Sequence, residues 1–255
     1  MSPITPDDPD FVTALARGLG VITCFGRGAE ALTLSEVAKE TGLTRGTARR
    51  LLLTLESLGY LRSDGKAFRL APKTLTLGYA YLSSLPLWQA AQPIMKDVVE
   101  ELDEACSLGV LDGQDVVYVA RVTPKHLYFT PIHLGTRMPA HINAMGQVLL
   151  AELAPSELDE YFRKAAFEKI TKYTLTDEAQ IRKVLMRVAH DRYALSDRQL
   201  QIGIRSVAVP IPAKSGRSEV AINATANENR ASKRDLIDRF LPVLRRASDQ
   251  LSHAL

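Results

Sequence analysis

The sequence predicts an α+β protein with a small N-terminal domain, a connecting helix and a larger C-terminal domain. Three observations lead to this prediction. Between residues 32 and 70, two short amphipathic helices are followed by a hairpin signal. From residue 88 onward, helical patterns alternate with paired strand patterns. The length of 255 residues allows two domains with separate cores.

We expect the chain to divide into four regions. Residues 1–10 hold three Pro and three Asp, a composition typical of a disordered arm. Residues 11–72 form the small domain, residues 73–87 the connecting helix, and residues 88–255 the larger domain. No repeat or low-complexity tract interrupts this order in the sequence.

The first expected helix runs from Phe11 to Phe25. Its apolar residues, among them Leu15, Leu19 and Ile22, recur at three- and four-residue spacing. We expect this stripe to pack behind the helices that follow. The Gly-Arg-Gly sequence after Phe25 then breaks the helix.

Two capped helices come next. The capping box Thr33-x-x-Glu36, in which a hydroxyl and a carboxylate satisfy free amides, starts a helix over residues 35–40. Gly42 provides the left-handed residue that ends this helix and turns the chain. Thr44 then caps a second helix. This order of helix, tight turn and helix indicates a helix-turn-helix.

The second of these helices has two distinct faces. Its apolar residues share one side and are Ala48, Leu51, Leu52, Leu55 and Leu58. The other side carries Arg45, Thr47, Arg49 and Arg50. A recognition helix needs this division, because its outer residues must reach the bases while its inner face packs on the domain. Arg can bond guanine bidentately, and Thr can contact a thymine methyl group or a phosphate.

A hairpin follows Gly59. Residues 60–62 and 67–70 are strand-like and flank Ser63-Asp64-Gly65-Lys66, in which Asp-Gly is a strong hairpin signal. We interpret this hairpin as the wing of a winged helix-turn-helix. The whole unit is therefore predicted to bind DNA.

The charge distribution favours the DNA-binding interpretation. From Arg45 to Lys73 there are seven Lys or Arg and two Asp or Glu, a local net charge of +5 in a chain whose total is +3. The alternative is that the arginines are only the solvated face of an amphipathic helix. Phosphate attraction supplies most non-specific affinity for DNA, so the concentrated charge favours a functional face. The residues expected to contact double-stranded DNA are Thr33, Thr44, Arg45, Thr47, Arg49, Arg50, Lys66 and Arg69.

The connecting helix is expected within the segment from Pro72 to Leu85. Leu75, Gly78, Tyr79 and Leu82 share one of its sides. This side can form a dimer contact, as in many two-domain regulators, or it can pack against its own domain. The sequence leaves both interpretations open.

The larger domain combines helices with antiparallel hairpins. Strands are expected over residues 107–111, 116–122, 126–133, 202–212 and 219–226. Helices are expected over residues 88–105, 143–153, 156–170 and 176–190, and from the Ser232-x-x-Asp235 cap to residue 253. Residues 134–141 are expected to be a loop. These elements predict helices layered on a central sheet.

Patterns of catalysis and of metal binding are missing from the sequence. Residues 203–207 lack the closing Gly of a nucleophile elbow. His126, His133 and His141 do not have the spacing of a common metal site, and no Gly-rich phosphate loop is present. We therefore expect no enzyme, no metal and no cofactor.

Cysteine usage and hydropathy bear on the location of the protein. Cys24 and Cys106 suggest neither a disulfide framework nor a zinc site. The N-terminus lacks the pattern of a signal peptide, and no apolar segment reaches 18 residues. We expect a cytoplasmic protein that does not bind a membrane.

A binding pocket is better supported than a catalytic site. Strand alternation groups Ile204 and Ser206 on one face of a strand, and Asn223 and Thr225 on one face of the next. Small polar groups that are buried need hydrogen-bond partners. A small organic ligand can provide them, and the alternative is that they bond to one another, to backbone or to water.

The motifs, in their order, resemble the isocitrate lyase regulator (IclR) family of bacterial transcription factors. FVTALARGLGVITCF and LTRGTARRLLLTLESLGYL carry the resemblance in the N-terminal half. In the C-terminal half LGTRMPAHINAMGQVLLAEL and YALSDRQLQIGIRSVAVPIPAKSGRSEVAINATA carry it. The resemblance implies a winged helix joined to a GAF-like effector-binding domain, and a homodimer or dimer of dimers that responds to small metabolites.

The resemblance also implies the position of the effector pocket. Its residues correspond to Ala144, Met145, Ser196, Ile204, Ser206, Asn223 and Thr225. Many members carry acidic residues near Ser196 and around residues 199–201, where this chain reads Ser-Asp-Arg-Gln-Leu-Gln. Met145 is also bulkier than the Gly, Ala or Ser that is usual near Ala144. These departures disfavour a glyoxylate- or pyruvate-like effector.

The opening helix and the recognition helix look most similar to the subgroup that controls aromatic-acid catabolism, including protocatechuate and β-ketoadipate pathway regulators. This similarity implies an aromatic carboxylate or a downstream dicarboxylate as effector. Arg137 or Arg121 can pair with its carboxylate, although either can equally be a surface ion-pair residue.

The combined prediction is a regulator that binds a palindromic operator as a symmetric assembly. Its effector would favour one arrangement of the DNA-binding domains through the connecting helix. Three alternatives stay open. They are a regulator of another carbon pathway with a different small acid, an enzyme with a winged-helix interaction module, and an architectural DNA binder without an effector.

Overall fold

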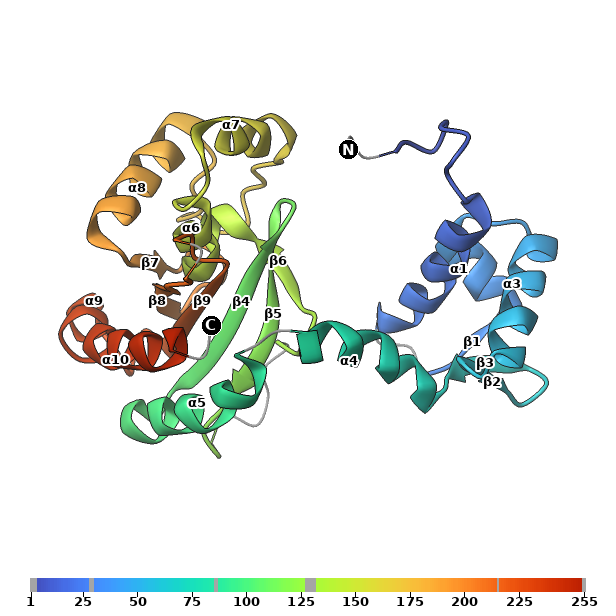
Figure 1. Cartoon of the computed structure of the whole chain (residues 1–255), viewed down its shortest axis with the longest axis horizontal. Coiled ribbons are helices and arrows are strands. Elements are labelled where there is room, and N and C mark those ends of the chain that lie inside the picture. Colours follow the sequence, from blue (N-terminus) through green and yellow to red (C-terminus); the bar gives the residue numbers. More distant parts are fainter. Residues whose placement is uncertain (1–3, 28–29, 85–86, 127–131, 215, 254–255) are drawn as a thin grey trace. The chain divides into compact units, whose positions relative to one another are not determined.

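The structure is a computed structural model that describes residues 4–27, 30–84, 87–126, 132–214 and 216–253. The chain divides into two compact units, Met1–Ser84 and Leu85–Leu255, which are drawn in Figure 1 and considered separately here. Of the strand expected over residues 126–133, residues 127–131 lie outside the described residues. In the described part of the chain, no helix has the length and apolarity needed to cross a membrane.

The first unit is a winged helix-turn-helix. Its helices are α1 (Thr13–Cys24), α2 (Leu34–Thr41), α3 (Arg45–Ser57) and α4 (Leu75–Ser84), with short 3-10 turns at Phe25–Arg27 and Pro72–Thr74. Its strands β1 (Leu32–Thr33), β2 (Leu61–Ser63) and β3 (Ala67–Leu70) form an antiparallel sheet in the order β1-β3-β2. The helix-turn-helix and the wing are confirmed.

The predicted caps explain where α2 and α3 begin and end. The Glu36 amide donates to the Thr33 hydroxyl, and the Thr33 amide donates to the Glu36 carboxylate at 2.7 Å. Gly42 has a φ of +65°, a conformation that glycine adopts without strain. The Thr44 hydroxyl accepts from the Thr47 amide at 3.2 Å. Each cap satisfies amides that a helix start leaves without partners.

Three leucines expected in the core lie on the surface instead. Leu15, Leu19 and Leu58 are 63%, 49% and 53% exposed. The buried residues of α1 are at its C-terminal end, where Val21 and Cys24 join the core of the unit. The buried stripe of α1 is therefore shorter than expected and does not include the N-terminal half of the helix. Leu58 misses the core because α3 ends at Ser57.

Helix α4 lies within the segment where the connecting helix was expected, and its described side chains are all at least partly exposed. Leu75 and Tyr79, which share one side, are 76% and 66% exposed. The alternative in which this side packs against its own domain is therefore not supported by burial within the first unit.

The second unit is a six-stranded antiparallel sheet covered by helices. The strands lie in the order β6 (Arg137–Pro139), β5 (Asp115–Val122), β4 (Ala105–Asp112), β9 (Val220–Asn227), β8 (Ile204–Ile211) and β7 (Ala194–Asp197). The helices are α5 (Trp88–Leu102), α6 (Ala144–Leu150), α7 (Pro155–Lys164), α8 (Glu178–Asp191), α9 (Lys233–Asp235) and α10 (Leu241–Ser252). A 3-10 turn at Ala140–Ile142 precedes α6, and a π-helical turn at Leu236–Phe240 joins α9 to α10.

The helices lie in two layers, one on each side of the sheet (Figure 1). Helix α6 contacts β4, β8 and β9 from one side, with α8 behind it. Helices α5 and α10 contact each other and cover the other side. The α+β class and the layered, GAF-like domain are confirmed.

Several expected element ends were wrong. The first helix of this unit stops at Leu102 rather than at residue 105, because Asp103 adopts a left-handed conformation with a φ of +54°. Helix α7 stops at Lys164 rather than near residue 170. The final helix contains a π-helical turn that no pattern in the sequence signalled.

In the described part of the second unit, two strands were missed. Residues 137–139, expected within a loop, form the short edge strand β6 beside β5. Residues 194–197 form the opposite edge strand β7 beside β8. Both strands are so short that their alternation is not distinct from that of a loop.

Candidate DNA-binding face and ligand cavity

The hydroxyls of two predicted DNA-contacting residues are used in helix caps. The Thr33 hydroxyl donates to the Glu36 carboxylate at 2.8 Å and also accepts the Glu36 amide. The Thr44 hydroxyl lies 3.0 Å from the Thr47 hydroxyl at the start of α3. These contacts fix the N-terminal ends of α2 and α3.

The predicted arginines of α3 are exposed. Arg45, Arg49 and Arg50 have no carboxylate partner among the described residues. Arg49 lines a surface groove between α3 and the wing, and Lys66 of the wing lines the same groove. Arg50 lies at another groove, between α3 and α1. Unpaired guanidinium groups of this kind can attract phosphate without first breaking an ion pair.

The wing is ordered by its Asp-Gly turn. The Asp64 carboxylate accepts the Lys66 and Ala67 amides, each at 2.9 Å, and Gly65 has a φ of +89°. The hydrogen bonds from Ala67 and Lys66 lower the pKa of Asp64. Arg69 donates to Asp64 at 3.2 Å, so its charge is partly neutralised.

The net charge of +5 counted over residues 45–73 is larger than the positive charge that is free to attract DNA. Arg69 also lies 3.9 Å from Glu30. Lys73 donates to the Leu58 carbonyl at 2.8 Å, at the end of α3. The arginines of α3 and Lys66 are therefore the better candidates for phosphate or base contacts.

A cavity of about 230 Å³ lies in the second unit, over the side of the sheet that carries α6. Its polar and charged lining residues are Glu104, Tyr118, Arg121, Asn143, Ser196, Gln201, Ser206, Thr225, Asn227 and Arg230. Its apolar lining includes Ile132, Met138, Ile142, Leu200 and Ile204. A cavity with mostly apolar walls and a few converging polar groups is typical of a small-molecule site.

Strand pairing places the predicted polar residues in one row. Ser206 of β8 pairs with Thr225 of β9 on one side and with Ser196 of β7 on the other. Paired residues of neighbouring strands point to the same face of a sheet. Asn223 lies two residues from Thr225, is 1% exposed, and donates to the Thr225 hydroxyl at 3.3 Å. Asn223 does not line the cavity, but it contacts the Thr225 side chain that does.

A β-bulge adds two further residues to the cavity. The register between β4 and β5 shifts between Leu108 and Gly109, so that Ser107 pairs with Arg121 while Gly109 pairs with Tyr118. Arg121 and Tyr118 are three residues apart and would point to opposite faces of a regular strand. The extra residue brings both to the cavity side.

Arg121 is the charged group that the cavity leaves without a counterion. Its Nη1 donates to the Ser107 hydroxyl at 3.0 Å, while its Nε is buried without a hydrogen-bond partner. No carboxylate among the described residues lies within ion-pair distance of Arg121. Burial lowers the pKa of Arg121, because the charged form loses hydration. An anionic ligand would supply the missing charge.

Asn143 connects the cavity to the start of α6. Its Oδ1 accepts the Met145 amide at 2.9 Å and so caps the helix. Its Nδ2 donates to the Tyr118 hydroxyl at 2.9 Å. Burial raises the pKa of Tyr118, so the phenol keeps its proton and can donate it to a ligand.

The rim of the cavity holds a second arginine with a different environment. Arg230 pairs with Glu104 at 2.5 Å and with Asp103 at 2.8 Å. Its charge is therefore balanced by two carboxylates, in contrast to that of Arg121.

Three residues predicted for the pocket lie elsewhere. Arg137 is outside the cavity lining and pairs with Asp112 and Asp115. Ala144 and Met145, at the start of α6, are fully buried in a core cluster that α6 forms with the sheet. The structure thus brings together Ser196, Ile204, Ser206 and Thr225, with Asn223 behind them.

Sequence reasoning did not select Tyr118 or Asn143. Asn at the first position of an expected helix is a capping signal, and it could have directed attention to Asn143. Tyr118 depends on the β-bulge, for which the sequence offers only Gly109 in a strand pattern.

Comparison with known families matches both units. The family model described as "IclR helix-turn-helix domain" matches residues 14–65, and "Bacterial transcriptional regulator IclR C-terminal" matches residues 79–253. The chain is 40% identical over 249 residues to the "Pca regulon regulatory protein" of Pseudomonas putida, covering 97% of this chain and 86% of that protein.

Two further relatives are named for aromatic acids. The chain is 36% identical to the "p-hydroxybenzoate hydroxylase transcriptional activator" of Acinetobacter baylyi, covering 95% of this chain and 91% of that protein. A crystal structure of a double mutant of the PobR inducer-binding domain from Acinetobacter, in complex with 3-hydroxybenzoic acid, is 32% identical with a TM-score of 0.63. The alignment covers 67% of this chain and 99% of the PobR domain.

Proposed function

The chain belongs to the IclR family of bacterial transcriptional regulators, and from this premise we propose that it senses a small aromatic carboxylate in the cavity of its second unit. Helix α3 then reads operator DNA, and occupancy of the cavity changes the affinity for that DNA. The pathway under its control is one of aromatic-compound catabolism, of the protocatechuate or β-ketoadipate type.

One observation carries the choice of ligand class. Arg121 lines the cavity with a buried Nε that has no partner, and the wall around it is largely apolar. Arg pairs well with a carboxylate in such a site. A dry cavity of about 150 Å³ can hold benzene, so about 230 Å³ suits one ring with a carboxylate. The names of the relatives from Acinetobacter point to the same ligand class.

A symmetric assembly suits the DNA-binding unit. The exposed Leu15, Leu19 and Leu58 line an apolar groove between α1 and α3, and Leu75 and Tyr79 of α4 are exposed as well. Exposed apolar surface of this kind is typical of an interface. We propose a homodimer or a dimer of dimers, which places two recognition helices about one DNA turn apart on a palindromic operator. Such a regulator works in the cytoplasm.

The competing function is that of an enzyme with an interaction module. The family consists of regulators, which favours binding over turnover. Incubation of the purified protein with 4-hydroxybenzoate, followed by chromatography, is expected to return the acid unchanged. A product formed in more than one equivalent per protein chain would show turnover and contradict a function in regulation alone.

Calorimetric titration tests the ligand class. We expect 4-hydroxybenzoate, 3-hydroxybenzoate or protocatechuate to bind, and the matching benzamides to bind at least about tenfold more weakly, since they lack the charge that pairs with Arg121. Binding of β-ketoadipate alone would instead indicate a non-aromatic acid.

Two arginine variants then locate the carboxylate. Arg121→Gln is expected to weaken binding of the acid by about 10- to 100-fold, because a charge-assisted hydrogen bond is lost. Arg137→Gln is the matched control, since Arg137 lies outside the cavity and pairs with two carboxylates. An equal loss in both variants, or a loss in Arg137→Gln alone, would reject the assignment.

A further inference from the structure

The connection between β7 and β8 forms one wall of the cavity. It consists of residues 198–203 and contributes Leu200 and Gln201 to the lining. Three backbone hydrogen bonds shape it, including Arg198 to the Ile204 carbonyl at 2.8 Å and Glu228 to the Gly203 carbonyl at 2.7 Å. A segment of this length without regular structure needs side-chain contacts to keep one shape.

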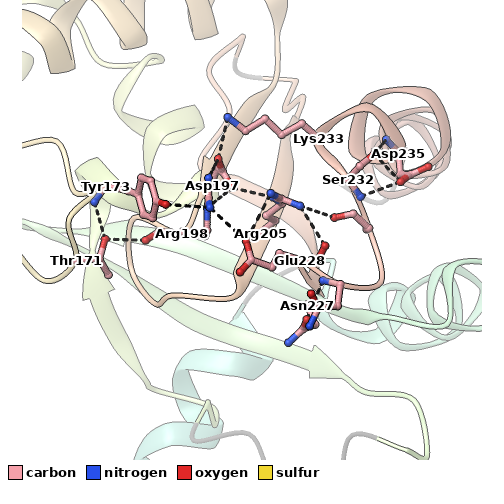
Figure 2. A network of polar contacts seen from close by, with 12 residues as sticks. Thr171, Tyr173, Asp197, Arg198, Arg205, Asn227, Glu228, Ser232, Lys233 and Asp235 are labelled. Carbon is pink, nitrogen blue, oxygen red and sulfur yellow. Dashed lines mark hydrogen bonds and ion pairs between the residues drawn. The ribbon is translucent and has the colours of Figure 1, made fainter.

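Asp197, at the end of β7, is the centre of an ion-pair network around this connection (Figure 2). Its carboxylate accepts from Arg205 at 2.8 Å, from Arg198 at 3.1 Å and from Lys233 at 2.8 Å. The Asp197 side chain is only 17% exposed. Burial opposes its ionisation, yet the hydrogen bonds from Lys233, Arg205 and Arg198 outweigh burial and hold the pKa of Asp197 well below its usual range.

Arg198 is held on its other side by a separate turn. Its guanidinium stacks 4.0 Å from the centre of the Tyr173 ring and donates to the Tyr173 hydroxyl at 3.1 Å. The Thr171 hydroxyl donates to the Arg198 carbonyl at 2.7 Å, as Figure 2 shows, and the Thr174 hydroxyl donates to the Gln199 carbonyl at 2.7 Å. Arg198 also has a φ of +59°, an uncommon conformation for a residue with a side chain.

Arg205 links the same carboxylate to the segment after β9. It donates to the Glu228 and Ala231 carbonyls at 3.2 and 3.0 Å. Glu228 provides a second carboxylate at longer distances, 3.4 Å from Arg198 and 3.6 Å from Arg205. Two guanidinium groups therefore meet at a partly buried point, and Asp197 is the carboxylate that contacts both most closely.

We propose that Asp197 is a positioning residue for the ligand cavity, whose ion pairs keep the 198–203 connection closed over the bound ligand. Without this carboxylate, the guanidinium groups of Arg198 and Arg205 repel each other, because both side chains are largely shielded from water. The connection then loses the ion pairs that hold it in place. Leu200 and Gln201 then leave the wall part of the time. The ligand escapes faster through the opened wall, so Asp197 sets the residence time without touching the ligand.

The network also keeps the charges of the site separate. Arg198 and Arg205, which are absent from the cavity lining, are neutralised by Asp197 and Glu228. Of the two arginines of the described lining, Arg230 pairs with carboxylates and Arg121 does not. Removal of Asp197 would therefore expose a competing positive charge beside the cavity.

Hydrogen–deuterium exchange of the ligand-free protein tests the inference without a ligand. Asp197→Asn is expected to speed exchange of the amides in residues 198–204 by about tenfold or more, because local opening becomes easier. Glu152→Gln is the matched control, since Glu152 is a carboxylate 9% exposed that pairs with Arg192 and is absent from the cavity lining. It is expected to leave residues 198–204 unchanged.

The second arm measures ligand release and depends on the proposed function. With 4-hydroxybenzoate as the probe, stopped-flow release from Asp197→Asn is expected to be roughly tenfold faster, with a smaller change in the association rate. Lys233→Gln removes only the ion pair between Lys233 and Asp197, in which the Lys233 side chain is 61% exposed. We expect Lys233→Gln to have a smaller effect in the same direction. It serves as the test variant if Asp197→Asn does not fold.

The outcomes separate the two proposals. If the wild-type protein binds no acid but Asp197→Asn opens the connection, the ligand class is wrong and the positioning role stands. If acid binds and Asp197→Asn matches Glu152→Gln in both exchange and release, the positioning role is overturned and the ligand class stands. If Asp197→Asn does not fold and Lys233→Gln changes neither measurement, the positioning role is overturned as well.

Discussion

Arg121 differs from several other arginines of its unit in what surrounds it. Arg137, Arg198, Arg205 and Arg230 each pair with at least one carboxylate. The Nη1 of Arg121 donates to the Ser107 hydroxyl, and its buried Nε has no hydrogen-bond partner. A charged group left in that state costs free energy in the empty protein, and a carboxylate ligand recovers it. The difference in pairing, rather than the presence of Arg, is the reason for proposing Arg121 as the ligand contact.

Arg49 makes the DNA-binding proposal testable at a single residue. Arg49→Ala is expected to weaken operator binding by about 1–3 kcal/mol, because an exposed guanidinium with no partner in the described structure is removed from α3. Gel-shift titration at fixed salt measures the loss. Arg234→Ala, which removes an equal charge from the other unit, is the control. Unchanged affinity in Arg49→Ala, or equal losses in both variants, would remove Arg49 from the DNA-binding face.

Sequence reasoning located part of the cavity and missed the rest for identifiable reasons. Alternation found the face that carries Ser206 and Thr225, because a regular strand repeats every two residues. It could not choose between Arg121 and Arg137, since the choice depends on Asp112 and Asp115 on neighbouring strands. Tyr118 required knowledge of a bulge in strand pairing.

At the scale of elements, α6 is the support of the cavity. Asn143 caps the start of α6. Gly146 of α6 approaches the backbone of Ala140 so closely that a Cβ at position 146 would overlap the Ala140 carbonyl oxygen and Cα. The close approach holds the 3-10 turn at Ala140–Ile142 against the helix. That turn provides Ile142 to the cavity and accepts the Ser196 hydroxyl at 2.6 Å.

Gly146→Ala is therefore expected to be strongly destabilising. The added methyl group meets backbone rather than a flexible side chain, and overpacking of this kind costs about 1–3 kcal/mol or more. Scanning calorimetry should show a lower transition temperature for the second unit. Gly78→Ala in α4 is the control, because its added Cβ meets nothing within 4 Å and alanine favours a helix. A Gly146→Ala variant as stable as the wild type would contradict the close packing.

The ends of elements were harder to predict than their existence. The caps at Thr33 and Thr44 were visible because capping chemistry is local. The end of α5 at Leu102 was not, because the left-handed residue there is Asp103 rather than Gly. Leu15 and Leu19 have the spacing of core residues, yet they line a surface groove, because periodicity does not tell a core position from an exposed one.

At the scale of the molecule, the two units have separate tasks and separate cores. The first presents unpaired arginines on α3, and the second encloses a cavity with an unpaired arginine on β5. A regulator requires that the two sites be coupled, so that a ligand with different affinities for two states shifts their populations. The coupling free energy is therefore the quantity that distinguishes a regulator from a DNA binder with an incidental cavity.

Fluorescence anisotropy of a labelled operator duplex, selected from random DNA by the protein itself, measures that coupling directly. The operator is titrated with wild-type protein in the presence and absence of a saturating aromatic acid, and the titration is repeated with Arg121→Gln. We predict that the acid changes the operator affinity of the wild-type protein by about 5- to 150-fold, the usual range of allosteric coupling, and that Arg121→Gln binds the operator but does not respond. Equal operator affinities with and without every acid that binds the wild-type protein would contradict a ligand-responsive regulator.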